Sequence, residues 1–330
     1  MEPEEKKRFS KEILFIENID EEIDRITKKL KEDIFRVFKR KGAFIGISGG
    51  VDSAVTLALA VKALGADKVI ALLLPEKDSS KDSKILALEL AHKFGVQTIE
   101  EDITAALDGF GCYRRRDEAV TAVFPEYNPK EYKMKIVLNQ GGSGHNLPPL
   151  FLLTIIDDAG QSKSKLIPMK EFLQIMASTN FKQRCRMAML YYHAERLHYA
   201  VVGTPNKHEV EQGFFVKFGD GGSDVMPIAH LYKTQVYQMA RVLEIPEKII
   251  NRIPTSDTYS AEQTQEEFFY QFPFAQMDLL WYAYENEIDV EVSASIMAMT
   301  IDEIKSIFNN FARKQRTSEY QRSAPIFYKD

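Results

Sequence analysis

The sequence has 330 residues, of which 45% are apolar and 28% charged, the composition of an ordinary globular protein with a sizeable core. A net charge of -5 argues against bulk binding to nucleic acid, and no apolar run approaches the ~20 residues that cross a bilayer. Because the N-terminal residues also lack an apolar signal core, we expect a cytoplasmic protein that associates with neither membranes nor nucleic acid. Cys112 and Cys185 form neither a CxxC pair nor a zinc spacing, so both are expected to be reduced.

The chain begins with a charged segment, residues 1–17, which we predict to be a frayed tail. We expect residues 18–330 to form a single domain, because the chain is long for one domain but short for two full ones. Apolar residues recur at helical spacing from Ile19 to Arg40, which predicts an amphipathic helix packed on a sheet.

The stretch from Ala43 to Ser53, AFIGISGGVDS, predicts a strand, a tight glycine turn and the start of a helix. Glycines let the backbone approach a ligand, and the free N–H groups at a helix start favour an anion. Asp52 would repel a phosphate unless a divalent cation lay between them, so the turn predicts a site for a metal-bound triphosphate or pyrophosphate. The competing interpretation is an ordinary strand-to-helix turn with a serine cap. The expected phosphate donors are Ser48, Gly49, Gly50 and Ser53.

Three further buried runs predict strands at Lys68–Leu74, Val96–Ile99 and Tyr199–Val202, and helical segments lie between them. This alternation predicts an α/β fold, a doubly wound parallel sheet flanked by helices, whose ligands bind beyond the carboxyl ends of the strands. Ser79 and Ser80 follow the second strand, so they are either neighbours of a nucleotide or solvated loop serines.

Residues 109–168 are interpreted as an insertion that contains a β-hairpin, with strands at Lys135–Leu138 and Leu150–Ile156 around a glycine-rich tip. The sequence leaves the role of this insertion open between a lid, a dimer arm, a docking surface and a solvated hairpin without function.

The next helix is predicted over Thr179–His198, with Thr179 or Asn180 as its N-cap. Arg184 and Arg186 would then lie in its first two turns, where cations oppose the helix dipole. We therefore expect these arginines either to bind a phosphate or carboxylate or to pair with an acidic residue.

The segment GTPNKHE follows the fourth strand and offers a second set of ligands at the same edge of the sheet. Within it, Glu209 supplies the second carboxylate that a cation at Asp52 requires, and Thr204 supplies a hydroxyl for phosphate. The glycine-rich stretch Gly213–Asp224 is predicted to be a binding loop, and Lys233 opens the next helix, from which it can reach a phosphate.

Five segments occur in order along the chain: SGGVDS, NFKQRCRM, GTPNKHE, GFFVKFGDGGSD and HLYKTQV. Together they resemble the NAD synthetase family, a branch of the N-type ATP pyrophosphatases with an adenine nucleotide alpha hydrolase-like fold. Enzymes of that family adenylylate the carboxylate of deamido-NAD with ATP and then transfer ammonia, which yields NAD, AMP and pyrophosphate. The resemblance implies a carbon–nitrogen ligase that uses ATP and Mg²⁺, forms a homodimer and takes ammonia either free or from a separate glutaminase. A lid over residues 255–270 would exclude water from the adenylate.

The resemblance also implies roles for individual residues. Asp52 and Glu209 would hold Mg²⁺ and, together with Lys233, would form the catalytic set. The ATP contacts would be Ile47, Ser48, Gly49, Gly50, Asp52, Ser53, Ser79, Thr204, Lys233 and Thr255. The contacts to the dinucleotide substrate would be Asn180, Arg184, Arg186, Lys217, Asp220, Asp224 and Arg322.

Three departures from the family pattern keep other functions open, one of which is that the hairpin insertion is longer than the usual connection. Residues 263–270 read QTQEEFFY where the family usually has QxDExxLG, and residues 320–322 read YQR where a His-Lys-Arg run is usual. One alternative is an amide-forming ligase of the same scaffold that acts on a different carboxylate. Another is a protein that binds nucleotide without turnover, although binding alone would not need both Asp52 and Glu209.

Overall fold

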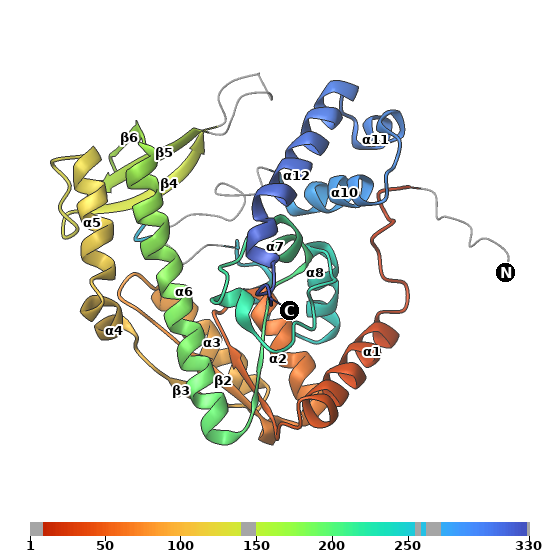
Figure 1. The fold of residues 1–330 in the computed structure, drawn as a ribbon. Coiled ribbons are helices and arrows are strands. Elements are labelled where there is room, and N and C mark those ends of the chain that lie inside the picture. The colour runs from red at the N-terminus through yellow and green to blue at the C-terminus, as the bar shows by residue number, and fades with distance from the viewer. Residues whose placement is uncertain (1–8, 140–149, 255–258, 262–271, 329–330) are drawn as a thin grey trace.

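The computed structural model describes residues 9–139, 150–254, 259–261 and 272–328 (Figure 1). Its central element is a four-stranded sheet in the order β3-β2-β1-β7, with every neighbouring pair parallel. Three of these strands are buried almost throughout, because helices cover the sheet on both faces. The predicted doubly wound parallel sheet is therefore confirmed. The strands are β1 (Ala43–Gly46), β2 (Val69–Leu73), β3 (Gln97–Glu100) and β7 (Ala200–Val202).

Alternate side chains along the strands enter two separate cores. Ala43 and Ile45 belong to one hydrophobic cluster, whereas Phe44 between them belongs to another on the opposite face. The helices of the first cluster are α1 (Ile19–Glu32), the π-helical turn η1 (Asp33–Val37), α2 (Val51–Leu64), α3 (Lys81–Lys93), α8 (Lys233–Val242) and α9 (Glu247–Ile250). The helices of the second cluster are α4 (Thr104–Gly109), α5 (Cys112–Val123) and α6 (Met169–Leu197). A short 3-10 turn, η2 (Ala66–Lys68), precedes β2.

The segment 109–168 contains a small antiparallel sheet in the order β4-β5-β6. Its strands are β4 (Tyr132–Asn139), β5 (Leu150–Asp157) and β6 (Ser162–Leu166). The β4–β5 pairing confirms the predicted hairpin, with Lys135 opposite Thr154. The prediction missed β6 and the helix α5, both of which belong to the same segment. The glycine-rich tip at 140–149 lies outside the described residues.

The long helix α6 corrects the predicted helix start. It begins at Met169 after Pro168, so Thr179 and Asn180 lie in its interior and neither caps it. Arg184 and Arg186 consequently lie in the middle of a 29-residue helix, and the argument from the helix dipole at its first two turns is wrong. In Figure 1 the green α6 runs from the small sheet down to the central sheet and joins the two.

The C-terminal helices form a third layer around the buried Trp281. This layer also buries Phe9 and Leu14, so the expectation of a frayed tail is wrong for that part of residues 1–17. Within the described residues no helix combines the length and apolar character needed to span a membrane. Cys112 and Cys185 are free thiols, as expected. The remaining elements are α7 (Lys207–Gln212), the turn η3 (Asp220–Gly222), α10 (Phe274–Glu285), α11 (Val290–Met297) and α12 (Ile301–Arg322).

Candidate active site

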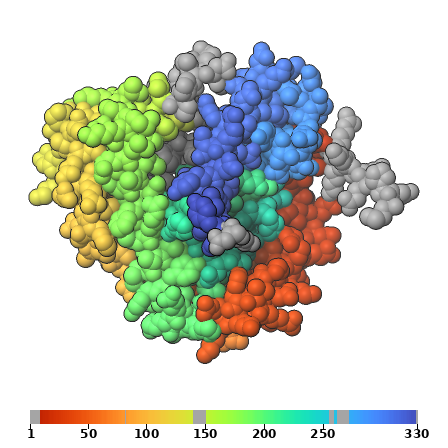
Figure 2. Space-filling view, viewed as in Figure 1, coloured from red at the N-terminus to blue at the C-terminus, as the bar shows by residue number. Residues whose placement is uncertain are grey.

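A cavity of about 540 Å³ opens at the carboxyl ends of β1, β2 and β7, where a parallel sheet of this kind binds its ligands. Its walls include α6 and the last turn of α12, and Figure 2 shows the blue end of α12 near the centre of one face, beside the green α6. Most of the predicted site residues line this cavity. Those of the predicted ATP set are Ile47, Ser48, Gly50, Asp52, Ser53, Ser79, Thr204 and Lys233. Those of the predicted dinucleotide set are Asn180, Arg186 and Asp220.

Serine hydroxyl groups stabilise the glycine-containing turn between β1 and α2. Ser53 Oγ donates to the carbonyl of Gly50 at 2.9 Å and lies 3.4 Å from Ser48 Oγ. Gly49 has φ +74°, and a Cβ on it would lie 2.6 Å from the carbonyl oxygen of Ser83. The turn therefore requires glycine at this position both for its backbone conformation and for the space beside α3.

Asp52 and Glu209 meet across this cavity, and Asn206 joins them. Asn206 is the N-cap of α7, and its side-chain oxygen accepts from the backbone N–H of Glu209 at 3.2 Å. Glu209 Oε2 in turn accepts from the backbone N–H of Asn206 at 2.9 Å, which completes a capping box. The side-chain amide of Asn206 donates to Asp52 Oδ1 at 3.2 Å. One residue thus fixes the positions of both carboxylates.

Lys233 stands at the start of α8 and forms an ion pair with the other oxygen of Asp52. Its side chain is completely buried. Burial alone would lower the pKa of Lys233, but Asp52 and Glu209 raise it above its usual value, so the ammonium stays charged. Burial and the neighbouring carboxylate of Asp52 raise the pKa of Glu209 to about 8. In the absence of a cation Glu209 is therefore largely protonated at neutral pH, and its ionisation would add a second negative charge that the single ammonium does not neutralise.

This electrostatic imbalance fits a divalent cation. Mg²⁺ is usually held by one or two carboxylates together with phosphate oxygens and water. Asp52 and Glu209 supply two carboxylates in one cavity, and the described part of the chain contains no group of three or more His, Cys, Asp or Glu placed to hold a metal by itself. The donor set therefore suits a cation that a nucleotide brings with it.

Asp220 and Arg186 form a second polar group in the cavity. Burial raises the pKa of Asp220 to about 6, although the backbone N–H of Val216 donates to its carboxylate at 2.8 Å. Arg186 donates from Nε to the carbonyl of Leu74 at 3.2 Å and is close enough to stabilise the charged form of Asp220. The negatively charged form of Asp220 and the guanidinium of Arg186 line the same cavity and can orient a polar substrate.

Five predicted site residues do not line the cavity. The carboxylate of Asp224 accepts from Tyr191 Oη at 2.9 Å and from the backbone N–H of Val201 at 2.8 Å, which fixes the loop to β7 and α6. Arg184 donates to the carbonyl of Lys217 at 3.2 Å, and Lys217 donates to the carbonyls of Tyr320 and Ser323. Arg322 donates to the carbonyl of Glu211 at 2.9 Å and to Ser318 Oγ.

Gly49 shapes the turn behind the cavity wall. Thr255 and most of the predicted lid lie outside the described residues.

Sequence reasoning missed several residues of this cavity. Asn206 was part of the motif GTPNKHE, but the prediction gave roles only to Thr204 and Glu209. Arg252 lines the cavity and donates to Ser83 Oγ at 2.8 Å beside the glycine turn. In the sequence it is marked only as a positively charged residue two positions before Pro254. Gln321 also lines the cavity, from the last turn of α12.

A buried acid behind the cavity supports both α7 and α8. Asp278 on α10 accepts from His208 Nε2, and its second oxygen accepts from the backbone N–H of Thr234 at 2.7 Å. Asp278 and His208 are both fully buried. His208 precedes Glu209 and Thr234 follows Lys233, so the C-terminal layer holds the backbone beside two of the charged groups of the site.

A sequence profile described as NAD synthase matches residues 21–134 and 153–325. The chain belongs to the NAD synthase family. The match is interrupted over 135–152, which covers most of β4, the hairpin tip and the start of β5. The family match therefore includes the charged residues of the cavity, and it leaves out residues 1–20, residues 135–152 of the hairpin and residues 326–330.

Individual relatives extend over nearly the whole chain. An NH(3)-dependent NAD(+) synthetase of Mesorhizobium japonicum is 42% identical over 92% of this chain and 95% of its own length. That of Thermotoga maritima is 34% identical over 93% of this chain and 97% of its own. Two solved structures share the fold at lower identity, an NMN synthetase from Francisella tularensis (TM-score 0.63, 21% identity) and an NH3-dependent NAD synthetase from Campylobacter jejuni (TM-score 0.61, 19% identity). Both matches cover 94% of this chain, and 98% and 99% of those chains.

Proposed function

We propose that this member of the NAD synthase family amidates the carboxylate of deamido-NAD with ammonia and consumes ATP, with NAD, AMP and pyrophosphate as products. The observation that carries the proposal is the meeting of Asp52 and Glu209 in one cavity at the strand ends. The names of relatives at 34–42% identity support deamido-NAD as the substrate. A carboxylate oxygen is a poor leaving group, so activation by AMP must precede the attack of ammonia.

In this proposal Asp52 and Glu209 would hold Mg²⁺, which would supply positive charge to stabilise the pyrophosphate leaving group. The ammonium of Lys233, which pairs with Asp52, and the backbone N–H groups at the start of α2 would share that charge. Ser48, Ser53 and Thr204 present hydroxyl groups to the same cavity. Asn180, Arg186 and Asp220 lie on the α6 side, where we place the dinucleotide.

A single assay tests this proposal. The protein is incubated with ATP, Mg²⁺, ammonium and deamido-NAD, and pyrophosphate and NAD are measured together. We expect equal amounts of both products, and no pyrophosphate when deamido-NAD is omitted. Pyrophosphate that appears only with another carboxylate, such as a pyridine mononucleotide, would favour the alternative ligase. Absence of pyrophosphate with every acid would favour nucleotide binding without turnover.

We further propose that the nitrogen donor is free ammonia, that the chain forms a homodimer and that it works in the cytoplasm. The NH(3)-dependent names of the relatives support the first point. The exposed apolar side chains of Leu166, Met169 and Leu173, with exposed fractions of 57–67%, support a second copy as partner. Glutamine in place of ammonium should give no NAD, and sedimentation should give a mass near twice 37.8 kDa. Activity with glutamine only after addition of another protein would indicate a separate glutaminase.

A further inference from the structure

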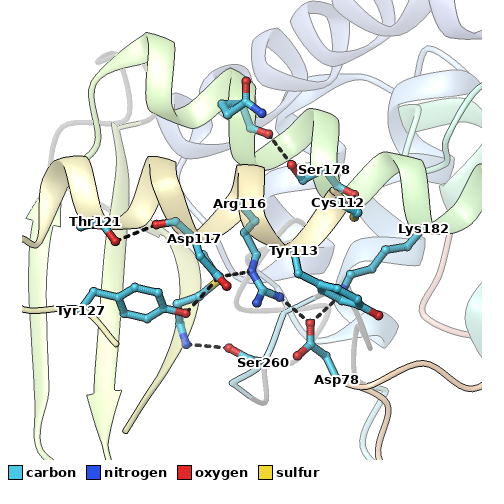
Figure 3. A network of polar contacts seen from close by, with 12 residues as sticks. Asp78, Cys112, Tyr113, Arg116, Asp117, Thr121, Tyr127, Ser178, Lys182 and Ser260 are labelled. Carbon is cyan, nitrogen blue, oxygen red and sulfur yellow. Dashed lines mark hydrogen bonds and ion pairs between the residues drawn. The ribbon is translucent and has the colours of Figure 1, made fainter. Parts of the chain in front are cut away.

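A buried cluster of charges joins the loop after β2 to α5 and α6 (Figure 3). Lys182 on α6 donates to Glu76 at 2.9 Å and to Asp78 at 2.7 Å. Arg116 on α5 forms an ion pair with the same oxygen of Asp78 and donates from Nε to Asp117 at 2.8 Å. Exposure is 1% for Lys182 and for Arg116 and 4% for Glu76, so the cluster is removed from water.

Such a cluster is stable only as a complete set. Burial alone would raise the pKa of Asp78, but Lys182 and Arg116 lower it below its usual value, so the acid stays ionised. Tyr113 Oη adds a hydrogen bond of 2.7 Å to Glu76. A buried ion pair contributes little net stability compared with apolar residues of the same shape, whereas removal of one partner leaves a charge without compensation. Stability alone therefore does not explain why the chain buries these charges here.

The cluster holds a loop that forms part of the cavity wall. Pro75, Ser79 and Ser80 line the cavity, and the two acids Glu76 and Asp78 lie between them in the sequence. The loop is also closed on itself, because the backbone N–H of Glu76 donates to Ser79 Oγ at 3.0 Å and that of Asp78 donates to Glu76 at 3.0 Å. The position of the acids therefore sets the position of the serines.

The cations come from the other walls of the cavity. Lys182 stands on α6 between Asn180 and Gln183, both of which line the cavity. Arg116 comes from the segment 109–168, and the same segment contributes Phe151 of β5 directly to the cavity, where its ring stacks on Phe172 of α6 at 4.5 Å. Segment 109–168, whose role the sequence left open, therefore contributes to the cavity in two ways. Phe151 lines the cavity directly, and Arg116 supports its wall through the charge cluster.

We infer that Arg116 and Lys182 are positioning residues for the nucleotide: they hold Glu76 and Asp78 so that the loop Pro75–Ser80 keeps its place in the cavity wall. This inference rests on the proposed function, in which the cavity binds ATP. The segment 109–168 then has a role inside its own subunit, as a support of the nucleotide site.

The test compares a broken cluster with an apolar replacement of the same pair. Arg116→Met leaves Asp78 one cation short, whereas the double variant Asp78→Leu/Arg116→Met removes both partners and keeps the net charge of the cluster. Arg114→Met is the matched control, because Arg114 lies on the same helix and forms an exposed pair with Glu118. Binding of MgATP is measured by calorimetry, thermal unfolding by circular dichroism, and KM and kcat in the coupled assay.

We expect Arg116→Met to unfold at a lower temperature and the double variant to recover most of that loss. The dissociation constant and the KM for ATP should rise at least about tenfold in both variants, with kcat within about twofold of wild type, because Asp52, Glu209 and Lys233 are untouched. Recovery of ATP affinity together with thermal stability in the double variant would overturn the inference, since the cluster would then be structural only. Unchanged ATP affinity in folded Arg116→Met would overturn it as well. A wild-type protein that does not bind MgATP would overturn the proposed function and the inference with it.

Discussion

Asp52 and Glu209 come from the turns after two different strands, and the side chain of Asn206 joins them through hydrogen bonds of 3.2 Å to each residue. β1 and β7 are adjacent parallel strands, so their carboxyl ends meet at the same edge of the sheet. The capping box at the start of α7 fixes Glu209, and the ion pair with Lys233 fixes Asp52. Both carboxylates are therefore held in place by protein contacts alone, as the proposed cation site requires.

Asp52→Asn should abolish pyrophosphate release, with a loss of at least about a hundredfold in kcat. The amide has the shape of the carboxylate but carries no charge for the cation or for Lys233. The measurement is the rate of pyrophosphate formation with ATP, Mg²⁺, ammonium and deamido-NAD. Asp24→Asn on α1 is the matched control, because Asp24 has a side-chain exposure of 71% and should leave the rate unchanged. An active Asp52→Asn enzyme would remove the metal assignment.

Glu209→Gln should stabilise the metal-free protein at high pH. The pKa of Glu209 in the folded protein is raised to about 8 from an ordinary value of 4.5, so stability is full at low pH and is lost as the pH rises through about 8. Glutamine stays neutral, and we expect its unfolding midpoint at pH 9 to exceed that of wild type by at least about 3 °C. The difference should vanish near pH 4.5. Excess MgATP should reverse the order, because only wild type gains stability from the ligand.

Gly49→Ala should distort the turn between β1 and α2, where we propose that ATP binds. The new Cβ would lie 2.6 Å from the carbonyl oxygen of Ser83, in addition to the strain of φ +74°. Gly95→Ala is the matched control, because Gly95 has φ +65° but nothing within 4 Å of the added Cβ. We expect about 1 kcal/mol of destabilisation for Gly95→Ala and at least twice as much for Gly49→Ala, in urea unfolding. Only Gly49→Ala should weaken ATP binding; equal effects at both positions would show that the space beside α3 is unimportant.

Asp278→Asn should destabilise the protein by about 3 kcal/mol, because one amide cannot accept from both His208 and the backbone of Thr234. Tyr284→Phe on the same helix is the control, since it loses one hydrogen bond of 2.9 Å to Gln315 and should cost about 1 kcal/mol. Urea unfolding measures both changes. Equal losses in the two variants would contradict the role of Asp278 as the support of α7 and α8.

The central sheet was predictable because its strands are short apolar runs separated by helices. The spacing of apolar residues changes from a continuous run to helical spacing at each boundary. The start of α6 was not predictable, because Thr179 and Asn180 are residue types that favour the N-cap position and therefore suggested a helix start ten residues too late. In the structure Thr179 Oγ1 donates back to the carbonyl of Met176 at 3.0 Å, which lets a capping residue stay inside a helix. β6 was missed because its residues, SKSKL, are exposed throughout, as suits an edge strand that carries lysines.

The charged part of the site was predictable from local motifs, because Asp52, Glu209 and Lys233 each follow a recognisable turn or helix start. Residues that depend on distant partners were not. Arg116 stands in the run RRR, which gives no sign of burial, because its burial depends on Asp78 from another element. Asp224 and Lys217 resembled ligands, yet the structure uses them to anchor backbone segments. Charge alone does not separate a group that binds substrate from one that holds a loop.

The most direct test of the shared cation site is a crystal structure with Mn²⁺ and a non-hydrolysable ATP analogue, with the ion located by its anomalous signal. A shared cation site predicts one ion within about 2.0–2.3 Å of a carboxylate oxygen of Asp52 and of Glu209, with phosphate oxygens as further ligands. An ion that contacts the phosphates but neither carboxylate, or only one of them, would contradict it.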